Sequence, residues 1–199
     1  QLDNTRFDQC KLEKSGFHAC RGTSASFKSA SLCFTKMKDC RWQECDFSLA
    51  DLTRLSVAAS AFPGCRMATA RLKEARLSMC DISGLDLRGA IWEKTHLPDS
   101  QLNGTTLAGA TLRLCSFNRA QARDADFSGM TAPHTSFYCA ELDKARFCDA
   151  NIEGAIFDLA RLDHTDFSRA KLSGAQFSEA KSIALTFSHA QLADANLGY

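Results

Sequence analysis

Residues 145–169 read ARFCD ANIEG AIFDL ARLDH TDFSR, which is five consecutive units of five residues. A large apolar residue stands at the centre of each unit, and Ala or Thr stands two positions before it. Extended in both directions, this spacing places a centre at 40 positions from Leu2 to Leu197, and only Gly22 and Ser182 among them are not apolar. A period of five fits neither an α-helix nor an alternating strand, so it predicts a solenoid of very short units.

A second column of small residues lies two positions before the centres. It has 39 positions from Thr5 to Ala195, of which 19 are Ala, 7 Cys, 6 Thr and 3 Ser. The large centres and the small residues two positions before them recur with the same period of five. Both can point inward only if the backbone turns a corner in every unit. Pro63, Pro98 and Pro133 follow a centre by one residue, and eight of the eleven glycines follow one by two. That order is typical of a type II turn, which favours Pro first and Gly second.

A period of twenty is superimposed on the period of five. Phe recurs at centres twenty residues apart in two columns, while the two intervening columns hold mostly Leu or Ile, with Trp42 and Trp92 as large exceptions. This alternation indicates a four-sided coil with like residues on opposite sides, filled to the density of a protein interior. The core column that it predicts for the later coils consists of Phe127, Phe137, Phe147, Phe157, Phe167 and Phe177.

Several units resemble the repeats of the pentapeptide repeat family. They include ADLTR at 50–54, ADFSG at 125–129, ANIEG at 150–154 and TDFSR at 165–169, and the resemblance covers the whole chain. It implies an all-β fold, a right-handed four-sided parallel β-helix in which four repeats make one coil, with about ten coils. Because the period is unbroken, we expect residues 1–199 to form a single continuous domain.

Ten cysteines in a chain of this size would suggest disulfides or a metal site, but their positions argue otherwise. Seven fall in the small inner column, where free Cys serves as a small core residue. Such a thiol-rich core indicates a reducing compartment. The seven are Cys10, Cys20, Cys40, Cys45, Cys65, Cys80 and Cys115; the other three, Cys33, Cys139 and Cys148, fall at outward positions and are the better candidates for reactive thiols.

No catalytic constellation stands out, and we expect a protein that is not an enzyme and has no cofactor. His18, His96, His134, His164 and His189 fall at outward positions without the paired spacing of a zinc site. The sequence around His164 also contains aspartates, but polar residues on a solvated surface account for that run. The glycines follow the turn period and form no phosphate-binding loop.

Charge separates two classes of function. The formal net charge is +1; residues 1–80 hold 13 Lys and Arg against 8 Asp and Glu, and residues 81–199 hold 11 against 15. The resemblance includes quinolone-resistance proteins, which mimic DNA and bind DNA gyrase or a related topoisomerase, and such mimicry needs a strongly acidic rod. Only the later coils approach one, through Glu141, Asp143, Asp149, Glu153, Asp158, Asp163 and Asp166. Direct nucleic-acid binding through Lys36, Lys38, Arg41, Arg66, Arg71, Lys73 and Arg76 is not expected either, because acidic residues are interspersed with them.

The leading interpretation is a non-enzymatic protein-interaction scaffold, with DNA mimicry directed at gyrase as the alternative. The resemblance implies the repeat module of a larger bacterial protein, a secreted effector or a secretion-associated protein among the options. The expected location is therefore the bacterial cytoplasm, or a host cytosol for an effector, without a membrane segment.

A protein partner of unknown identity is expected to bind one patch of outward residues. In a coil of twenty residues Cys139 and Leu159 share a column, and Tyr138 and Ile156 lie close to them. Clustered exposed apolar residues with an aromatic anchor are typical of an interface. The centres continue to Leu197, so the terminal coils are expected to need flanking segments or to associate end to end.

Overall fold

The corner of each repeat has a left-handed backbone conformation in the computed structural model, which describes residues 1–198. The residue two after each centre, from Asn4 to Asp194, has a φ between +47° and +69°, and Thr69 is the one exception among these corners. Glycine occupies eight of the corners, where a positive φ carries no steric cost. The remaining corners adopt the same conformation with a side chain, so the repeat imposes the turn even without Gly.

Short parallel strands form on three sides of the coil. The sheets have the orders β1-β3-β5-β7, β2-β4 and β6-β8-β9, and every pair joins residues twenty apart, such as Phe17 with Met37. The strands are β1 (Gly16–His18), β2 (Arg21–Thr23), β3 (Lys36–Lys38), β4 (Arg41–Gln43), β5 (Ser56–Ala58), β6 (Leu72–Lys73), β7 (Arg76–Ser78), β8 (Ile91–Glu93) and β9 (Thr111–Arg113).

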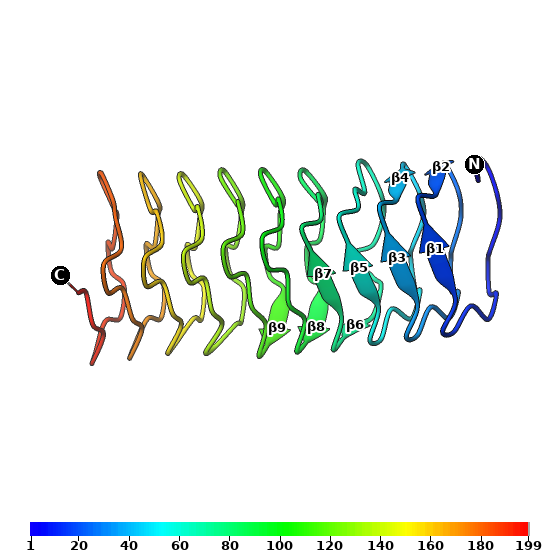
Figure 1. The fold of residues 1–199 in the computed structure, drawn as a ribbon. Coiled ribbons are helices and arrows are strands. Elements are labelled where there is room, and N and C mark those ends of the chain that lie inside the picture. The colour runs from blue at the N-terminus through cyan, green and yellow to red at the C-terminus, as the bar shows by residue number, and fades with distance from the viewer. Residues whose placement is uncertain (199) are drawn as a thin grey trace.

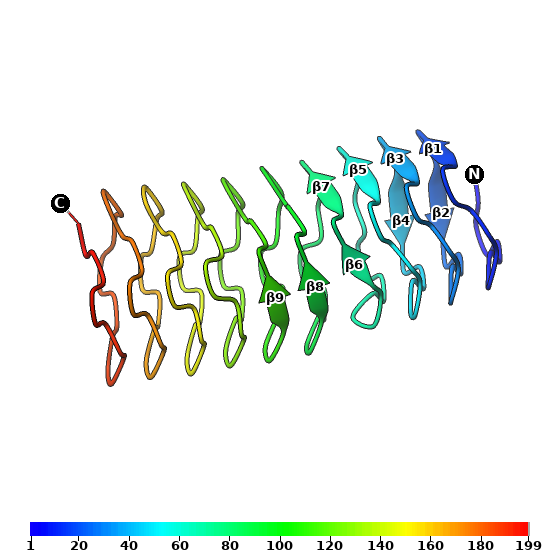
Figure 2. The same ribbon diagram turned by 90° about the horizontal axis from the view of Figure 1, so that it is seen from below.

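Isolated parallel bridges continue this register beyond the strands. They also join residues twenty apart, from Arg6 with Ser26 to Gln176 with Asn196. The coils therefore stack along one axis, with the two ends of the described chain at opposite ends of a rod (Figures 1 and 2). The all-β parallel β-helix that the resemblance to pentapeptide repeats implies is confirmed. No part of the described chain forms a helix of the length and hydropathy needed to cross a membrane.

The core is a continuous column of side chains along the rod axis. Phe127, Phe147 and Phe167 stack with ring centroids 4.8 and 4.9 Å apart, and Phe137 and Phe157 stack beside them at 5.1 Å. Rings of the two stacks meet edge to face, at 5.4 Å between Phe137 and Phe147. These are the favourable aromatic geometries. The six phenylalanines of the expected core column, Phe127, Phe137, Phe147, Phe157, Phe167 and Phe177, are all at most 3% exposed.

Several polar side chains of the small inner column donate to a carbonyl of the coil before them, whereas the buried hydroxyl of Thr135 has no hydrogen-bond partner among the described residues. The hydroxyl of Thr95 donates to the carbonyl of Leu72 at 2.7 Å, and that of Thr165 donates to the carbonyl of Leu142 at 2.8 Å. A thiol does the same, since Cys65 donates to the carbonyl of Trp42 at 3.1 Å. Because buried polar groups need a partner, this shared bond explains why Thr, Ser and Cys substitute for Ala there.

Gly22, one of the two centres without an apolar side chain, lies against a tryptophan. A Cβ at Gly22 would be 2.9 Å from Cζ3 of Trp42 in the next coil and 3.3 Å from the carbonyl oxygen of Leu2 in the coil before it. Trp42 is fully buried, so the missing side chain makes room for the indole ring. The other such centre, Ser182, is exposed near the end of the chain.

The cysteines of the inner column are free thiols. Five are buried, whereas Cys10 and Cys20 are half-buried because they lie in the first coil, which has a neighbour on one side only. Burial raises the pKa of Cys80 to about 12 and that of Cys115 to about 11, so both stay protonated near neutral pH. Their position is that of small core residues, as expected from the sequence.

Candidate protein-binding surfaces

The four residues of the expected binding patch lie on two adjacent coils. Tyr138 and Cys139 form the corner after Phe137, and Ile156 and Leu159 belong to the next coil. Tyr138 is 40%, Ile156 36% and Leu159 41% exposed. We call Tyr138, Cys139, Ile156 and Leu159 the apolar patch.

Backbone hydrogen bonds fix the spacing of the apolar patch. The N–H of Cys139 donates to the carbonyl of Asp158 at 3.0 Å, which places the Tyr138 corner beneath the Leu159 corner. A parallel bridge also joins Ser136 to Ile156. The four side chains therefore project from neighbouring positions of one side of the rod, on backbone that is hydrogen-bonded between the two coils.

Charged groups border the apolar patch on both sides along the rod. Toward the N-terminus, Arg119 forms an ion pair with Asp99 at 2.5 Å. The carboxylate of Asp158 lies on the coil of Ile156 and Leu159, and that of Glu179 lies on the next coil toward the C-terminus. The pKa of the Tyr138 phenol is raised, first by its hydrogen bond with the Cys139 side chain and then by the neighbouring negative charges, so the phenol stays a neutral hydrogen-bonding group. An apolar centre with a polar rim is the usual composition of an interface.

One of the three outward thiols does not lie where the sequence indicated. Cys148 is buried, 8% exposed, and its Sγ lies 3.1 Å from Oδ2 of Asp166. Burial and the nearby carboxylate raise the pKa of this thiol, so the expectation of a reactive surface thiol at Cys148 is wrong. The side chain of Asp166, on the following coil, contacts the Cys148 thiol. The position of Cys148 within the repeat does not predict this contact. Cys33 and Cys139 are half-buried, and burial raises the pKa of Cys33 as well.

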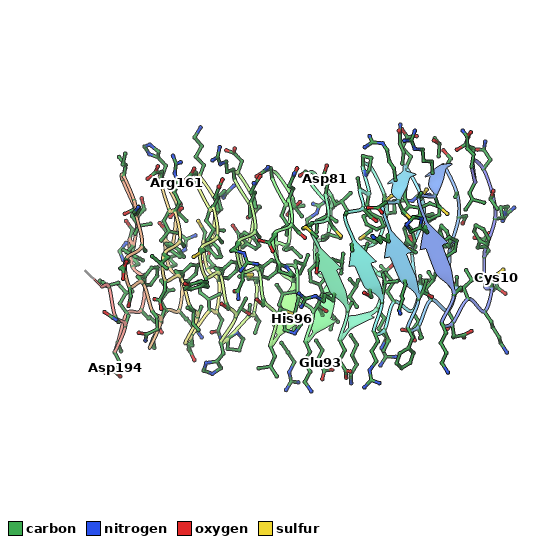
Figure 3. The ribbon with its side chains drawn as sticks, in the orientation of Figure 1. Cys10, Asp81, Glu93, His96, Arg161 and Asp194 are labelled. Carbon is green, nitrogen blue, oxygen red and sulfur yellow. The ribbon has the colours of Figure 1, made fainter. Side chains whose placement is uncertain are left out.

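The aspartates near His164, Asp163 and Asp166, form structural bonds instead of a charge relay. Asp163 pairs with Arg161 at 3.0 Å and accepts the backbone N–H of Ile183 at 2.9 Å. Asp166 accepts the backbone N–H of Ser168 at 2.8 Å. The side chain of His164 is exposed. Polar side chains, Arg161 and Asp194 among them, lie along the outside of the rod in Figure 3.

Arginines neutralise much of the acidic surface of the later coils. Arg123 lies 2.8 Å from Glu141, and Arg169 lies 2.7 Å from Asp149. Asp143 is shared by Arg123 and Arg161. Of the seven acidic residues that the sequence singled out there, Glu141, Asp143, Asp149 and Asp163 thus have an arginine within 4 Å.

The basic residues of the first coils lie on several sides of the rod. The bridges place Lys36 in one column with Arg76, whereas Arg41 pairs with Arg21 on another side. Arg66 forms an ion pair with Asp46 at 3.0 Å. The set therefore does not form one basic face of the kind that follows a phosphate backbone.

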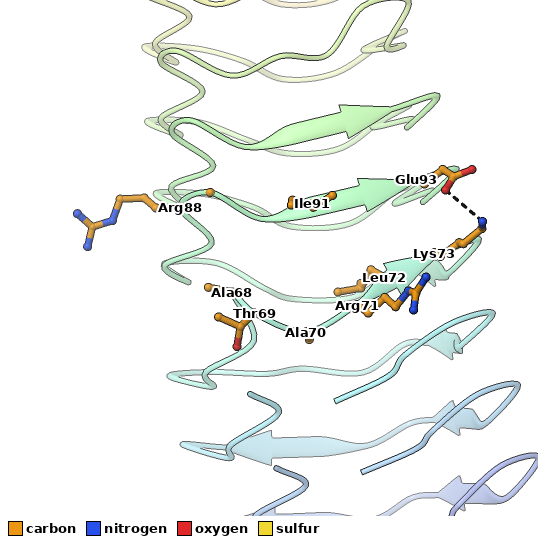
Figure 4. Close-up of a pocket in the computed structure, with 10 residues that line it drawn as sticks. Ala68, Thr69, Ala70, Arg71, Leu72, Lys73, Arg88, Ile91 and Glu93 are labelled. Atoms are coloured by element: carbon orange, nitrogen blue, oxygen red, sulfur yellow. Dashed lines mark ion pairs between the residues drawn. The ribbon is translucent and has the colours of Figure 1, made fainter. Parts of the chain in front are cut away.

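A second candidate surface was not anticipated from the sequence. The wall of the rod opens between residues 65–71 of one coil and residues 85–91 of the next, a feature that we call the wall opening. Neither the bridge expected between Arg66 and Asp86 nor that between Arg71 and Ile91 forms in the described chain. The two coils rejoin at Leu72, which pairs with Trp92. Figure 4 shows Leu72 and Lys73 on the first of these coils and Ile91 and Glu93 on the second.

The wall opening coincides with an unusual residue at the corner. Thr69 is the one corner without a positive φ, and it is also the one β-branched residue among the corner positions of the sequence. A β-branched side chain is strained at positive φ. The signal was therefore present in the sequence, but reading it required knowing that every other corner is left-handed.

The described fold is a parallel β-solenoid built from units of five residues, and comparison with known families agrees with it. A model described as the pentapeptide repeat region matches residues 35–112, and one described as pentapeptide repeats (8 copies) matches residues 115–154 and 145–181. The chain belongs to the pentapeptide repeat family. It matches no curated protein sequence.

Solved structures of other pentapeptide repeat proteins are similar to this chain. A trypsin-treated variant of QnrB1, a plasmid-mediated fluoroquinolone resistance protein, has a TM-score of 0.54 at 22% identity, over 92% of this chain and 84% of that chain. HetL, involved in heterocyst differentiation regulation in the cyanobacterium Nostoc sp. strain PCC 7120, has a TM-score of 0.47 at 24% identity, over 96% and 88%. At 22% identity the likeness to the QnrB1 variant shows the fold alone.

Proposed function

We propose that this chain is a non-enzymatic scaffold that binds a partner protein through the apolar patch. The observation that carries the proposal is the grouping of Tyr138, Cys139, Ile156 and Leu159 on adjacent coils, partly exposed and bordered by charged side chains. Other exposed apolar residues, such as Phe34 and Leu114, stand singly. Aromatic side chains on rigid backbone are common centres of binding energy.

The arrangement of the polar side chains supports a binding role over catalysis. Aspartates such as Asp46 and Asp51 accept backbone N–H groups two residues later. The histidines project to solvent from positions spread along the rod. Catalysis requires a nucleophile or base held within hydrogen-bond reach of its partner, and the described side chains are arranged around corners instead.

Within this proposal, the chain is the repeat module of a larger bacterial protein, an effector or a secretion-associated protein among the options. It acts in the bacterial cytoplasm, or in a host cytosol if it is delivered there. End-to-end association is a further part of the proposal, since Phe7 and Phe17 in the first coil are only half-buried. Light scattering over a range of protein concentrations tests the association.

The apolar patch is tested by charge substitution. In the double variant Tyr138→Asp and Leu159→Asp, capture of a partner by a photo-crosslinker at Ile156 should fall at least about tenfold, because two buried contacts become desolvated charges. The matched control is Met79→Asp with Leu114→Asp, two residues that are 60% and 55% exposed elsewhere on the rod. Equal capture by both folded double variants would place the binding surface elsewhere.

The alternative, a DNA mimic that binds gyrase or another topoisomerase, has less support. QnrB1 shares the fold, but fold alone does not carry its activity to this chain. The net charge of +1 and the arginines beside Glu141 and Asp149 work against a phosphate-like potential. We expect equimolar protein neither to inhibit gyrase nor to protect it from a quinolone, and either effect in a supercoiling assay would favour the alternative.

A further inference from the structure

The wall opening leaves main-chain groups of two coils without backbone partners. Elsewhere the N–H of a centre donates to the carbonyl nineteen residues later, as Phe47 does to Arg66 at 2.8 Å. Within residues 1–198, the corresponding bonds from Met67 to Asp86 and from Thr69 to Arg88 are absent. The reverse bonds, from the N–H of Asp86 and Ile91 to the carbonyls of Cys65 and Ala70, are absent as well.

Thr69 explains why the two coils part here. Its backbone does not take the left-handed corner conformation, so its N–H does not reach the next coil. Its side chain instead serves the coil before it, because the N–H of Leu49 donates to Oγ1 of Thr69 at 3.2 Å. The Thr69 side chain thus keeps a hydrogen bond with the preceding coil, at Leu49, while the backbone bond from Thr69 to the following coil, at Arg88, is lost.

A cavity of about 410 Å³ occupies the wall opening. Its floor and sides are largely apolar, from Ala68, Ala70, Leu72, Gly89 and Ile91. Three cations and one carboxylate line its rim, namely Arg71, Lys73, Arg88 and Glu93, and Figure 4 shows these side chains on the two coils.

The rim carries an excess of positive charge. Lys73 forms an ion pair with Glu93 at 3.2 Å, and Arg88 pairs with Asp86 at 2.6 Å. Arg71 forms no ion pair within 4 Å in the part of the chain that the structure describes. The occupant that complements this rim therefore carries negative charge.

We propose that the wall opening binds an extended acidic peptide segment of a partner protein through main-chain hydrogen bonds. The two edges of the wall opening, residues 65–71 and 85–91, each offer backbone N–H donors and carbonyl acceptors without backbone partners in the described chain. A peptide strand can bond to both kinds of group, whereas a simple anion can accept only from the N–H groups. Unpaired strand edges are templates for such addition, in which main-chain bonds give affinity and side-chain contacts give specificity. The surface is separate from the apolar patch, so neither proposal depends on the other.

The test uses three peptides and residue-resolved amide signals of the 199-residue chain. The probes are acetyl-Val-Glu-Val-Asp-Val-amide, its counterpart with lysines at the two charged positions, and an N-methylated acidic version that lacks backbone donors. We expect the acidic peptide alone to shift the amide signals of Met67, Thr69, Asp86 and Ile91 and to slow their hydrogen exchange about tenfold. Equal effects of the lysine peptide, or no effect of the acidic peptide at about 1 mM, would overturn the proposal.

Two variants separate the opening from the charge. Thr69→Gly permits the left-handed corner, so it should restore protection of the Met67 amide and abolish peptide binding. Unchanged peptide binding by a variant whose Met67 amide has become protected would contradict the proposal.

Arg71→Gln keeps the opening and should weaken binding about tenfold, whereas Arg41→Gln, an exposed arginine of β4 on another coil, should not. If the Met67 amide stays unprotected in Thr69→Gly, the peptide affinity of Arg71→Gln is the deciding measurement. Undiminished binding of the acidic peptide by that variant refutes the proposal.

Discussion

Single atoms decide the fit of a residue in this repeat. The missing Cβ of Gly22 gives Trp42 its space, and the second branch on the Cβ of Thr69 prevents a corner that less hindered residues adopt. The Gly22 effect arises because the next coil places Trp42 at the same position twenty residues later, whereas the Thr69 effect is local, because a β-branched side chain is strained at positive φ. A substitution at an inward position can therefore disturb the coil before and the coil after it as well as its own.

Gly22→Ala should destabilise the protein by about 1–3 kcal/mol, because the new methyl group would lie 2.9 Å from the Trp42 ring in a filled core. The measurement is the free energy of unfolding in denaturant. Gly16→Ala is the matched control, since a Cβ there has no atom within 4 Å, and its effect should stay within about 0.5 kcal/mol. Similar losses for the two variants would contradict the assigned contact.

Aspartates one residue before a centre should make the protein sensitive to acid. Burial raises the pKa of Asp46, Asp51 and Asp166, but hydrogen bonds from Ser48, Thr53 and Ser168 outweigh it, and each pKa lies below its usual value of 3.8. A lowered pKa in the folded state contributes stability above about pH 3.8 that is lost as the pH falls through the folded value.

The melting temperature should therefore fall as the pH decreases below about 4. The triple variant with Asn at positions 46, 51 and 166 should lose part of this dependence, because Asn accepts the same N–H without titrating. Asp124→Asn is the control, since that exposed side chain accepts no hydrogen bond among the described residues. An unchanged pH slope in the triple variant would show that other groups cause the acid sensitivity.

At the scale of the element, the unit of stability is the stacked column rather than the strand. Strands of two or three residues are too short to hold together alone. Phe147 illustrates the column, because its ring stacks on Phe127 and Phe167 and meets Phe137 and Phe157 edge to face. Each ring thus joins three successive coils.

Phe147→Ala should cost about 3–5 kcal/mol, because it removes a fully buried ring and leaves a cavity that the flanking coils cannot fill. Denaturant unfolding gives the value. Ser173→Ala, at an outward and half-buried corner without a side-chain hydrogen bond, should lie within about 0.5 kcal/mol of the unmodified chain. A loss for Ser173→Ala as large as that for Phe147→Ala would contradict the inward assignment.

At the scale of the whole molecule, stability is a sum over coils and their interfaces. The first and last coils each contact one neighbour, and their centres, such as Leu12 and Leu192, are only half-buried. Centres between Phe27 and Phe177 are buried throughout. The rod is therefore expected to loosen from its ends.

Hydrogen exchange should follow this gradient. Amides of residues 127–167 should exchange most slowly, and those of residues 1–20 and 181–198 faster, because local opening of a terminal coil breaks one interface instead of two. Mass spectrometry of peptic peptides measures the profile. Uniform exchange along the rod, or slower exchange at the ends than in the Phe column, would contradict the additive picture.

Much of the fold could be predicted because the repeat is local. The period of five sets which residues face inward, and the period of twenty sets which residues stack, so the buried Phe column and the parallel register follow from position alone. The positions of Tyr138 and Leu159 on neighbouring coils follow in the same way. The burial of Cys148 did not follow, because it depends on the conformation of the Asp166 side chain.

The sequence by itself therefore determined the solenoid, its inner columns and the residues that could share a face. Only the tertiary structure decided which charges are paired, as at Arg123 with Glu141, and where the wall parts, at Thr69. The physical reason is that the period gives the position of a residue within its coil. Which charges form ion pairs, and where two coils separate, depends instead on the side-chain and backbone conformations of both coils together. A single corner that does not take the left-handed conformation leaves the period intact, and four backbone hydrogen bonds between the two described coils are absent there.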